Sequence, residues 1–554
     1  MNKKVCSFPI LFALLALLIG TCAVVFPASA QAAPASTGSI TVSGTVASSY
    51  DAYQIFSANV VDGDSDAKIA TDLAWASDAV RDAALPVLHS AGMPNSQTTA
   101  QEAAEWLNTD SHLTSALSAQ LARSLQSSGA EPVALNAGTA AELPCGYWLI
   151  VAKDDAIAQG EVGTAPIMAL VGGSAVTVKP KAATPKVAKH VLEDSTAVWQ
   201  KAADATVGDD LYWRLSATVP AGLTAYDTYT VRFVDTMSAG LDPSKVAASM
   251  RVYVAAGADG GFDAVQTGKD GRAGTEPAKG WTDITAQCRV SVDGKTFTVR
   301  TGDLIAALGG ADAFTAGSRV VAVYNAPLNS ACNHGIAKGN PNEVYLRYPR
   351  SPFADQSGDA GFTRTPSDDA CAYTWDLALT KRGSDGDKPL AGAVLSIADD
   401  RGRTLAADGT WDAEGKATVT TGEDGRVTVS GVDSGKLEVR ELKAPKGYTA
   451  FEGTRSVTVK AEGLDVDQVA AAKPKLTITA ESPLRADSAD GSTGSLEASL
   501  INTPTGTPPS ITTGGFMPST GDMAMYAAAA AAVAGAALIV VALLVKRGGG
   551  SHKE

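Results

Sequence analysis

The run TWDLALTK at residues 374–381 decides the fold of its region, because apolar and polar side chains alternate along it. Such alternation is typical of a strand with one buried face. Two similar runs follow, LAGAVLSI at 390–397 and RVTVS at 426–430. Short strands at this spacing predict an immunoglobulin-like β-sandwich for residues 371–503.

Two further β-rich regions precede this one. Residues 183–352 contain several strand-like runs, such as RVVAVY at 319–324, and predict a second sandwich. Residues 31–182 begin and end with strand-like runs but are rich in Ala, Leu, Gln and Glu at about 71–88 and 99–125. Leucines recur at a spacing of four in the second segment, which predicts an amphipathic helix. The first domain is therefore expected to be a sandwich with a helical insertion.

Composition marks the segments around the three predicted domains. Residues 353–370 are rich in Gly, Asp, Ser and Thr and are expected to be a linker or a long loop. Residues 504–516 form a spacer rich in Pro and Thr. The predicted fold class is mainly β, with three tandem domains between a leader at 1–30 and a C-terminal signal at 517–554.

Charge and cysteine usage narrow the functional classes. The formal net charge is −14, and an acidic surface repels phosphate backbones, so nucleic-acid binding is not expected. Four cysteines remain outside the leader, and three disulfide pairings stay open. Their wide spacing shows no C-x-x-C pair and the histidines are scattered, so neither a metal nor another cofactor is expected. The four are Cys145, Cys288, Cys332 and Cys371.

The N-terminus has the order of a secretory leader. Lys3 and Lys4 precede an apolar run that ends near the small-residue sequence ASA at 28–30. Cleavage is expected after Ala30 or two to three residues later. An uncleaved membrane anchor is the alternative.

The C-terminus carries a second signal. The sequence MPSTG at 517–521 precedes an apolar run at 527–545, and Lys546 and Arg547 follow. At a rise of about 1.5 Å per residue, this run can just cross a hydrocarbon core of about 30 Å. The basic pair is then expected on the cytoplasmic side. The alternative is an ordinary single-pass membrane protein with a chance MPSTG.

This order resembles the cell-wall sorting signal L-P-x-T-G that sortases read, with Met517 in place of leucine. Pro518 fixes the local backbone and removes a donor, which suits an extended segment in an enzyme groove, and Ser519 stands at the variable position of the motif. The resemblance implies that a sortase cuts between Thr520 and Gly521. It then holds the threonine as a thioester until an amine resolves it.

The third region contains LEVRELKAPKGY at 437–448. This resembles the E-box of pilin and collagen-adhesin B-type domains, Y-x-L-x-E-T-x-A-P-x-G-Y, although leucines replace the first aromatic residue and the threonine. In that family a first-strand lysine condenses with a last-strand asparagine beside the E-box glutamate. The resemblance implies Lys381, Asn502 and Glu441 in these roles.

The chemistry of such a condensation needs burial. Loss of water disfavours a charged ammonium and frees the amine lone pair of a residue such as Lys381. Burial likewise favours a protonated acid, so that Glu441 donates to the asparagine oxygen while ammonia leaves. The alternative is an ordinary salt bridge between these two residues, with Asn502 in a nearby turn.

The second region suggests a similar group built on an aspartate. Its sequence FVDTMSAGL resembles the segment that bears the catalytic aspartate of central pilin domains, which implies Asp235. Lys189 would be the first-strand lysine and Asn342 the last-strand asparagine, with Asn340 as a nearby rival. A solvated strand-end aspartate is the alternative. The first domain offers no such triad.

An intermolecular nucleophile is implied by VTVKPK at 176–181, which resembles the end of the pilin motif with Lys179 in the tyrosine position. The terminal lysine of the motif maps to Lys181, which would attack the sortase-held Thr520 of another subunit. A charged linker lysine is the alternative.

Together these resemblances imply a sortase-assembled backbone pilin of a Gram-positive bacterium, secreted and anchored to the cell wall after transient retention by its C-terminal helix. The expected partners are pilus and housekeeping sortases, other copies of the chain, minor pilins and peptidoglycan, with host ligands open. The protein is expected to be no enzyme beyond its own bond formation. A monomeric wall-anchored adhesin and a minor tip or base pilin are the alternatives.

Overall fold

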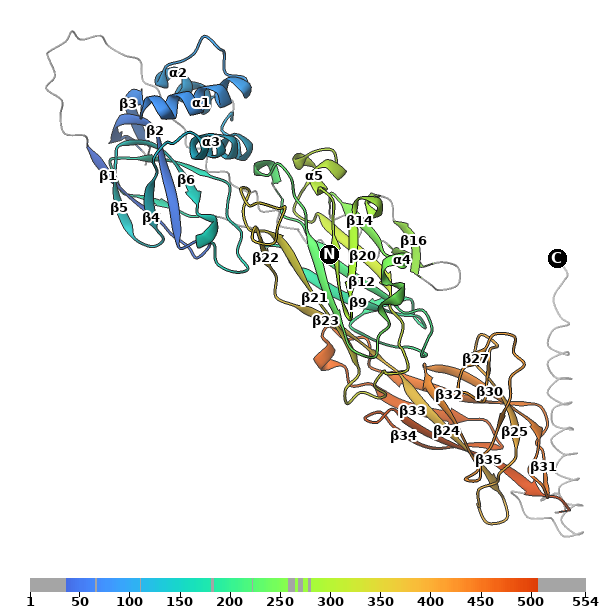
Figure 1. Cartoon of the computed structure of the whole chain (residues 1–554). Helices are drawn as coiled ribbons and strands as arrows, with labels where there is room; N and C mark the ends of the chain where they lie inside the picture. Colours follow the sequence, from blue (N-terminus) through green and yellow to red (C-terminus); the bar gives the residue numbers. More distant parts are fainter. Residues whose placement is uncertain are drawn as a thin grey trace, which may run out of the picture.

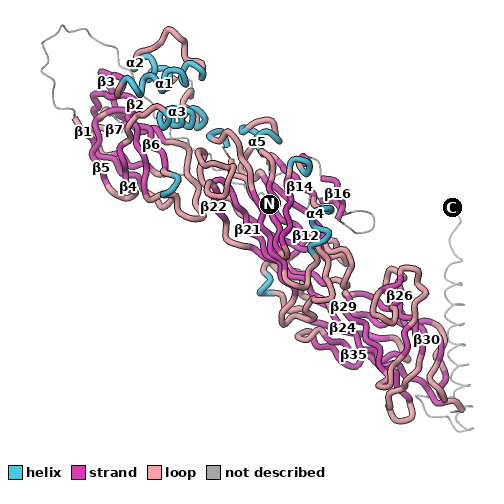
Figure 2. The backbone as a smooth tube through the Cα atoms, viewed as in Figure 1, coloured by secondary structure: helices cyan, strands magenta, loops and turns pink. Residues whose placement is uncertain are grey.

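The computed structural model describes residues 36–506, except 65–66, 110, 181–183, 222, 258–264, 268–272 and 278–279. Three β-rich domains follow one another along a single long axis (Figure 1). Helices gather in the first domain, and strands dominate the other two (Figure 2). The predicted mainly β, multidomain architecture is confirmed. Over the described residues, none of the helices combines the length and apolar character needed to cross a membrane. The leader, the sorting sequence and the apolar C-terminal run lie outside the described residues.

The first domain packs two sheets against each other, with strand orders β5-β1-β8 and β3-β2-β6-β7, and β4 pairs with β2. Its elements are β1 (Thr37–Val42), β2 (Ser49–Asp62), β3 (Lys68–Trp75), α1 (Asp78–Ser90), α2 (Ala100–Asn108), α3 (Ser115–Ser127), β4 (Val133–Asn136), β5 (Ala140–Pro144), β6 (Gly146–Ala152), β7 (Ile167–Val171) and β8 (Val176–Val178).

The three helices are the predicted insertion, and they cover one face of the larger sheet. Leu149 packs toward the helices, whereas its neighbour Trp148 packs between the two sheets. Thr114 caps α3 by accepting from the backbone N–H of Leu117. Leu113 therefore precedes the helix and is exposed. The leucines that follow it at a spacing of four, Leu117, Leu121 and Leu125, are buried. The predicted first segment at 71–88 begins in β3 instead of a helix.

The central domain is a larger sandwich with strand orders β10-β9-β12-β20-β14-β17 and β11-β23-β21-β13-β19-β18. Its elements are β9 (Val187–Glu193), β10 (Val198–Gln200), β11 (Ala202–Asp204), β12 (Tyr212–Thr218), β13 (Arg232–Met237), α4 (Val246–Ser249), β14 (Arg251–Ala255), β15 (Val265–Thr267), β16 (Ala273–Pro277), β17 (Trp281–Asp283), β18 (Arg289–Asp293), β19 (Thr296–Arg300), α5 (Leu304–Ala307), β20 (Arg319–Asn325), β21 (Asn340–Pro349), β22 (Phe362–Arg364) and β23 (Asp368–Tyr373).

The predicted linker at 353–370 differs in the structure. β22 and the start of β23 fall within it, and both strands pair with β21 of the central sheet. Residues 362–364 and 368–370 are therefore paired in the sheet, although the segment is polar. The central domain therefore extends to Tyr373, and the third domain begins directly afterwards.

The third domain also has two sheets, with strand orders β29-β24-β35-β31 and β27-β26-β25-β30-β32-β33, while β34 pairs with β35 and β28 with β25. Its elements are β24 (Trp375–Gly383), β25 (Val394–Ala398), β26 (Thr404–Leu405), β27 (Trp411–Asp412), β28 (Val419–Thr420), β29 (Arg426–Val432), β30 (Gly435–Lys443), β31 (Tyr448–Thr449), β32 (Thr454–Glu462), β33 (Lys475–Ala480), β34 (Leu484–Asp490) and β35 (Ser495–Pro504).

Side-chain contacts hold neighbouring domains together. Arg123 of α3 lies 3.1 Å from the carboxylate of Asp227 at the first junction. At the second junction the Trp375 indole N–H donates to Asp204 Oδ2 at 2.6 Å. These contacts give the three domains a defined relative placement.

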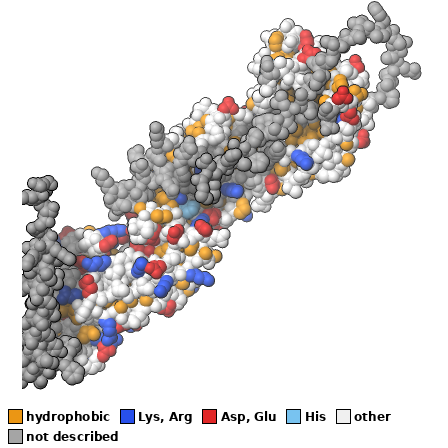
Figure 3. All heavy atoms as spheres, turned by 180° about the vertical axis from the view of Figure 1, so that it is seen from behind, with side chains coloured by type: hydrophobic (Ala, Val, Ile, Leu, Met, Phe, Trp, Pro, Cys, Tyr) orange, Lys and Arg blue, Asp and Glu red, His pale blue; other side chains and the backbone are white. Residues whose placement is uncertain are grey.

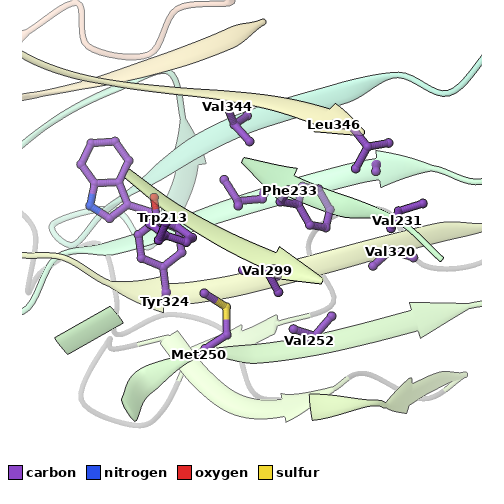
Figure 4. Packing of buried hydrophobic residues seen from close by; sticks show 14 of the residues in the cluster. Trp213, Val231, Phe233, Met250, Val252, Val299, Val320, Tyr324, Val344 and Leu346 are labelled. Carbon is purple, nitrogen blue, oxygen red and sulfur yellow. The ribbon is translucent and has the colours of Figure 1, made fainter. Parts of the chain in front are cut away.

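Charged side chains are interspersed on the surface seen in Figure 3. Exposed pairs such as Lys436–Glu438, at 2.9 Å, hold opposite charges together on the third domain. Pairs of this kind add little to stability, because water and salt screen exposed charges. The stability of the sandwiches therefore depends mainly on their buried cores, of which Figure 4 shows the central one.

Candidate cross-linking sites

The first candidate site lies inside the third domain, at inward strand positions that alternation would otherwise fill with apolar side chains. Lys381 on β24, Glu441 on β30 and Asn502 on β35 each follow buried apolar residues at intervals of two. The structure brings these three predicted residues together. The side chains of Lys381 and Glu441 are fully buried.

The contacts among the three groups are direct. The Lys381 amine donates to Asn502 Oδ1, and its Nζ lies 3.0 Å from Glu441 Oε1. Asn502 Nδ2 donates to the same carboxylate oxygen at 2.9 Å. β24 and β35 are parallel neighbours, with Gly383 opposite Asn502, so the lysine and the asparagine are diagonal neighbours on one face.

Burial sets the electrostatics of this site. It lowers the pKa of Lys381 from 10.5 to about 8, while the charge of Glu441 opposes the shift. The backbone N–H of Phe451 donates to Glu441 Oε2 at 3.1 Å, and its ring centroid lies 6.0 Å from the lysine Nζ. A neutral amine held against an amide in an apolar enclosure is suited to nucleophilic attack on the amide carbon.

The second candidate site lies in the core of the central domain. Lys189 on β9 comes from one sheet, and Asp235 on β13 and Asn342 on β21 come from the other. All three are completely buried. The structure therefore also brings the second predicted group together, with Tyr324 of β20 among its members.

A tyrosine hydroxyl is the centre of this second group. The Lys189 amine donates to Asp235 Oδ2 and, at 2.9 Å, to Tyr324 Oη. The hydroxyl donates to Asp235 Oδ2 at 3.0 Å and accepts from Asn342 Nδ2 at 2.8 Å. Asn342 thus reaches the lysine and the aspartate through the phenol.

Burial favours the neutral forms of these groups. It lowers the pKa of Lys189 from 10.5 to about 8 and raises the pKa of Asp235, although each opposes the other's shift by its charge. Burial also raises the pKa of the Tyr324 phenol well above 10.0. A buried charged pair costs several kcal/mol per ion in desolvation, which a neutral amine and acid avoid.

The rival asparagine, Asn340, is occupied elsewhere. Its Nδ2 donates to the backbone oxygens of Asn333 and Ala372, and its Oδ1 accepts from the backbone N–H of Asn333 at 2.8 Å. It holds a turn before β21. The geometry therefore favours Asn342 as the partner of Lys189.

Tyr324 was not among the residues predicted from the sequence. It lies at the end of the run RVVAVY, where alternation places it on the same inward face as Val320 and Ala322. An aromatic side chain at such a position is ordinarily a core residue, so its hydroxyl gave no separate signal.

An acidic cluster at the second junction was also missed. Glu193 and Asp204 of the central domain meet Asp433 of the third, beside a cavity of about 520 Å³. Burial and then the charge of Asp204 raise the pKa of Glu193 from 4.5 to about 8. Burial likewise raises the pKa of Asp433 well above 3.8. Within the described residues, no group of three or more His, Cys, Asp or Glu side chains is arranged to hold a metal ion.

The remaining predicted residues are distributed as follows. The four cysteines outside the leader are free thiols, with Cys145 and Cys371 buried. β8 ends at Val178 and β9 begins at Val187. Lys181 falls between them, outside the described residues, as do Met517, Pro518, Ser519, Thr520 and Gly521.

Comparison with known families defines the class of the third domain. Residues 376–473 match the family described as SpaA, a prealbumin-like fold domain. The match includes Lys381 and Glu441 and ends before Asn502. The third domain is thus of the SpaA prealbumin-like class.

Individual relatives extend the comparison. The chain is 30% identical over 143 residues to the trypsin-resistant surface T6 protein of Streptococcus pyogenes serotype M6, a match that spans 24% of each chain. The predicted resemblance to Gram-positive major pilins is confirmed by this similarity and the domain match.

Solved structures of similar proteins include two pilins. The T6 backbone pilin of serotype M6 Streptococcus pyogenes has 17% identity and a TM-score of 0.47, with 86% of this chain and 100% of that chain covered. The major pilin SpaD from Corynebacterium diphtheriae has 15% identity and a TM-score of 0.40, with 84% and 98% covered.

Proposed function

We propose that this protein is a structural shaft subunit of a covalently polymerised cell-surface pilus, stiffened by internal lysine–asparagine amide bonds. The meeting of Lys381, Glu441 and Asn502 on the first and last strands of the third domain is the observation that carries the proposal. The similarity to the T6 surface protein and the SpaA-type domain supports it.

The internal reaction balances without a co-reactant. The neutral Lys381 amine attacks Cγ of Asn502, a C–N bond forms, and the Cγ–Nδ2 bond breaks. Oδ1 of Asn502 faces Lys381 and Nδ2 faces Glu441. Rotation of the amide by half a turn exchanges these two atoms, so that a protonated Glu441 donates to Oδ1 during the attack. The amine proton passes to Nδ2, which leaves as ammonia. The protein catalyses this step on itself and is no enzyme toward a separate substrate.

The position of this bond suits a load-bearing fibre. Tension along the chain enters the third domain at Trp375 and leaves it near Pro504. A bond from Lys381 to Asn502 carries that tension across two adjacent parallel strands. The intervening residues are then unloaded, so strand hydrogen bonds are not required to resist the force. A bond from Lys189 to Asn342 does the same for most of the central domain.

Polymerisation is proposed to use the two ends of the subunit. A pilus sortase cleaves MPSTG between Thr520 and Gly521, and Lys181 of another copy resolves the thioester. Lys181 follows β8, which pairs with β1 at the border of the first domain. A housekeeping sortase then joins the base of the fibre to peptidoglycan. The fibre would support adhesion, and minor pilins would complete it.

A Lys181→Arg variant tests the polymer. Surface extracts of the wild type and of the matched Lys179→Arg control should show a high-mass ladder under denaturing conditions, whereas Lys181→Arg should show single subunits. A ladder that persists in Lys181→Arg excludes this lysine as the linking amine. Single subunits in the wild type would indicate a monomeric wall-anchored adhesin, and immunogold labelling only at one fibre end would indicate a minor pilin.

A further inference from the structure

The Tyr324 hydroxyl contacts the Lys189 amine, the Asn342 amide and the Asp235 carboxylate. Its oxygen lies 2.9 Å from Lys189 Nζ, 2.8 Å from Asn342 Nδ2 and 3.0 Å from Asp235 Oδ2. A phenol has one proton to donate and two lone pairs to accept with, which matches these three contacts. Tyr324 is thus satisfied only as a neutral hydroxyl.

The surroundings of the ring fix this hydroxyl in place. Phe297 packs edge-to-face against Tyr324 with 4.7 Å between ring centroids. Figure 4 shows Tyr324 beside Trp213 in the apolar core. Lys189 Nζ lies 5.4 Å from the Tyr324 ring and 5.5 Å from the Trp213 ring, so aromatic faces enclose the amine.

The two candidate sites differ in how the asparagine contacts the lysine and the acid. In the third domain Asn502 contacts both Lys381 and Glu441 directly. In the central domain Asn342 Oδ1 lacks a hydrogen-bond partner among the described residues, and the Asn342 amide contacts Tyr324 through Nδ2. The route from the aspartate to the departing amide nitrogen therefore passes through the phenol.

We propose that Tyr324 is a catalytic residue of the central cross-link, whose hydroxyl relays a proton from Asp235 to the amide nitrogen that leaves Asn342. This inference rests on the proposed function, because it concerns the same bond formation. Asp235 itself does not contact the leaving nitrogen of Asn342. Tyr324 is therefore the fourth member of this group and connects the two.

The proton transfers balance. The Lys189 ammonium first passes one proton to Asp235, and its amine nitrogen attacks Cγ of Asn342 to form the new C–N bond. Tyr324 then donates its proton to Nδ2 and takes the proton of Asp235. Asp235 removes the second proton from the attacking nitrogen as the Cγ–Nδ2 bond breaks. Ammonia leaves, Tyr324 regains its hydroxyl, and Asp235 ends protonated.

A Tyr324→Phe variant tests the relay in the full ectodomain, because it removes the hydroxyl and keeps the ring. Intact mass is followed with time after cell-free synthesis of the ectodomain, so that the bonds start open, and peptide mapping distinguishes the two bonds. Tyr324→Phe should slow closure of the central bond by roughly 10²–10⁴-fold, the usual contribution of a proton-transfer group. The third-domain bond should close at the wild-type rate. Central closure at the wild-type rate overturns the proposal.

Controls separate this inference from the proposed function. Tyr348→Phe removes another buried hydroxyl of the same domain, which donates to Gly160, and should leave the central bond intact. If the wild type lacks the Lys189–Asn342 bond, the proposed function fails for this domain. If Tyr324→Phe does not fold, 3-fluorotyrosine at position 324 keeps the hydroxyl and makes it more acidic. An unchanged rate of closure then overturns the relay.

Discussion

Lys381 and Asn502 are hydrogen-bonded across two adjacent parallel strands although 121 residues separate them in the sequence. Because one belongs to the first strand of the third domain and the other to the last, a bond between them closes nearly the whole domain. Closing a loop of this length stabilises a fold by about 5 kcal/mol in the chain-entropy account of cross-links. The third domain is therefore expected to depend strongly on this pair.

Replacement of Glu441 should prevent that closure. Glu441→Ala removes the carboxyl group beside the reacting pair, so the deficit of the ectodomain relative to the mass of its own sequence should be smaller than that of the wild type by one ammonia. Its third domain should lose about 5 kcal/mol of unfolding free energy. Glu438→Ala, on the exposed face of the same strand, is the matched control and should retain the bond. An equal mass deficit in Glu441→Ala and the wild type, each compared with its own sequence, would show that the glutamate is dispensable.

The two asparagines of β21 should respond differently. Asn342→Ala removes the amide near Lys189 and should abolish the central bond. Asn340→Ala should keep the bond but lose about 1–3 kcal/mol of stability, because backbone groups of Asn333 and Ala372 lose their partner. Intact mass and chemical denaturation measure the two effects. Loss of the bond in Asn340→Ala alone would reverse the assignment.

A cut inside the closed loop should not release a fragment. The turn between β26 and β27, at residues 406–410, is mostly exposed and suits an inserted protease site. After cleavage, the third domain of the wild type should remain one species on a denaturing gel. The same insertion combined with Glu441→Ala should give two. Separation into two pieces in both proteins would rule out the covalent closure.

The second junction should weaken as pH rises. Burial and the charge of Asp204 raise the pKa of Glu193 from 4.5 to about 8, so the folded junction holds a proton that the unfolded chain releases between these values. The stabilisation is complete below pH 4.5 and is lost as pH rises through about 8. Asp433, whose pKa is also raised, acts in the same direction.

Hydrogen exchange across residues 201–207, corrected for intrinsic rates, measures this effect. Protection in the wild type should fall from pH 5 to pH 9, a range that spans the two pKa values of Glu193. Glu193→Gln cannot ionise and should reduce the dependence, with the remainder due to the neighbouring acids. An identical pH dependence in both proteins would remove Glu193 as the cause.

Strand alternation made much of the third domain predictable. The period of two that buries Leu377 and Leu379 also places Lys381 inside, and the same period places Asn502 beside Leu500 on the inward face. A lysine and an asparagine at such inward positions then indicated a possible cross-link. Tyr324 was missed because an aromatic residue at an inward position fits an ordinary core.

Contacts between segments that are distant in the sequence were harder to predict. The polar composition of residues 353–370 predicted a linker, yet β22 and the start of β23, which fall within it, pair with β21 of the central sheet. The backbone hydrogen bonds of a strand do not require apolar side chains. Likewise, Glu193 and Asp433 lie 240 residues apart and meet only because the two domains dock. No local pattern encodes such a meeting.

The most direct measurement is the intact mass of the purified ectodomain, followed by peptide mapping. The account predicts a mass lower than that of the sequence by two ammonia molecules, with one branched peptide joining Lys381 to Asn502 and another joining Lys189 to Asn342. A mass equal to that of the unmodified sequence, with all four residues recovered in separate linear peptides, would contradict it.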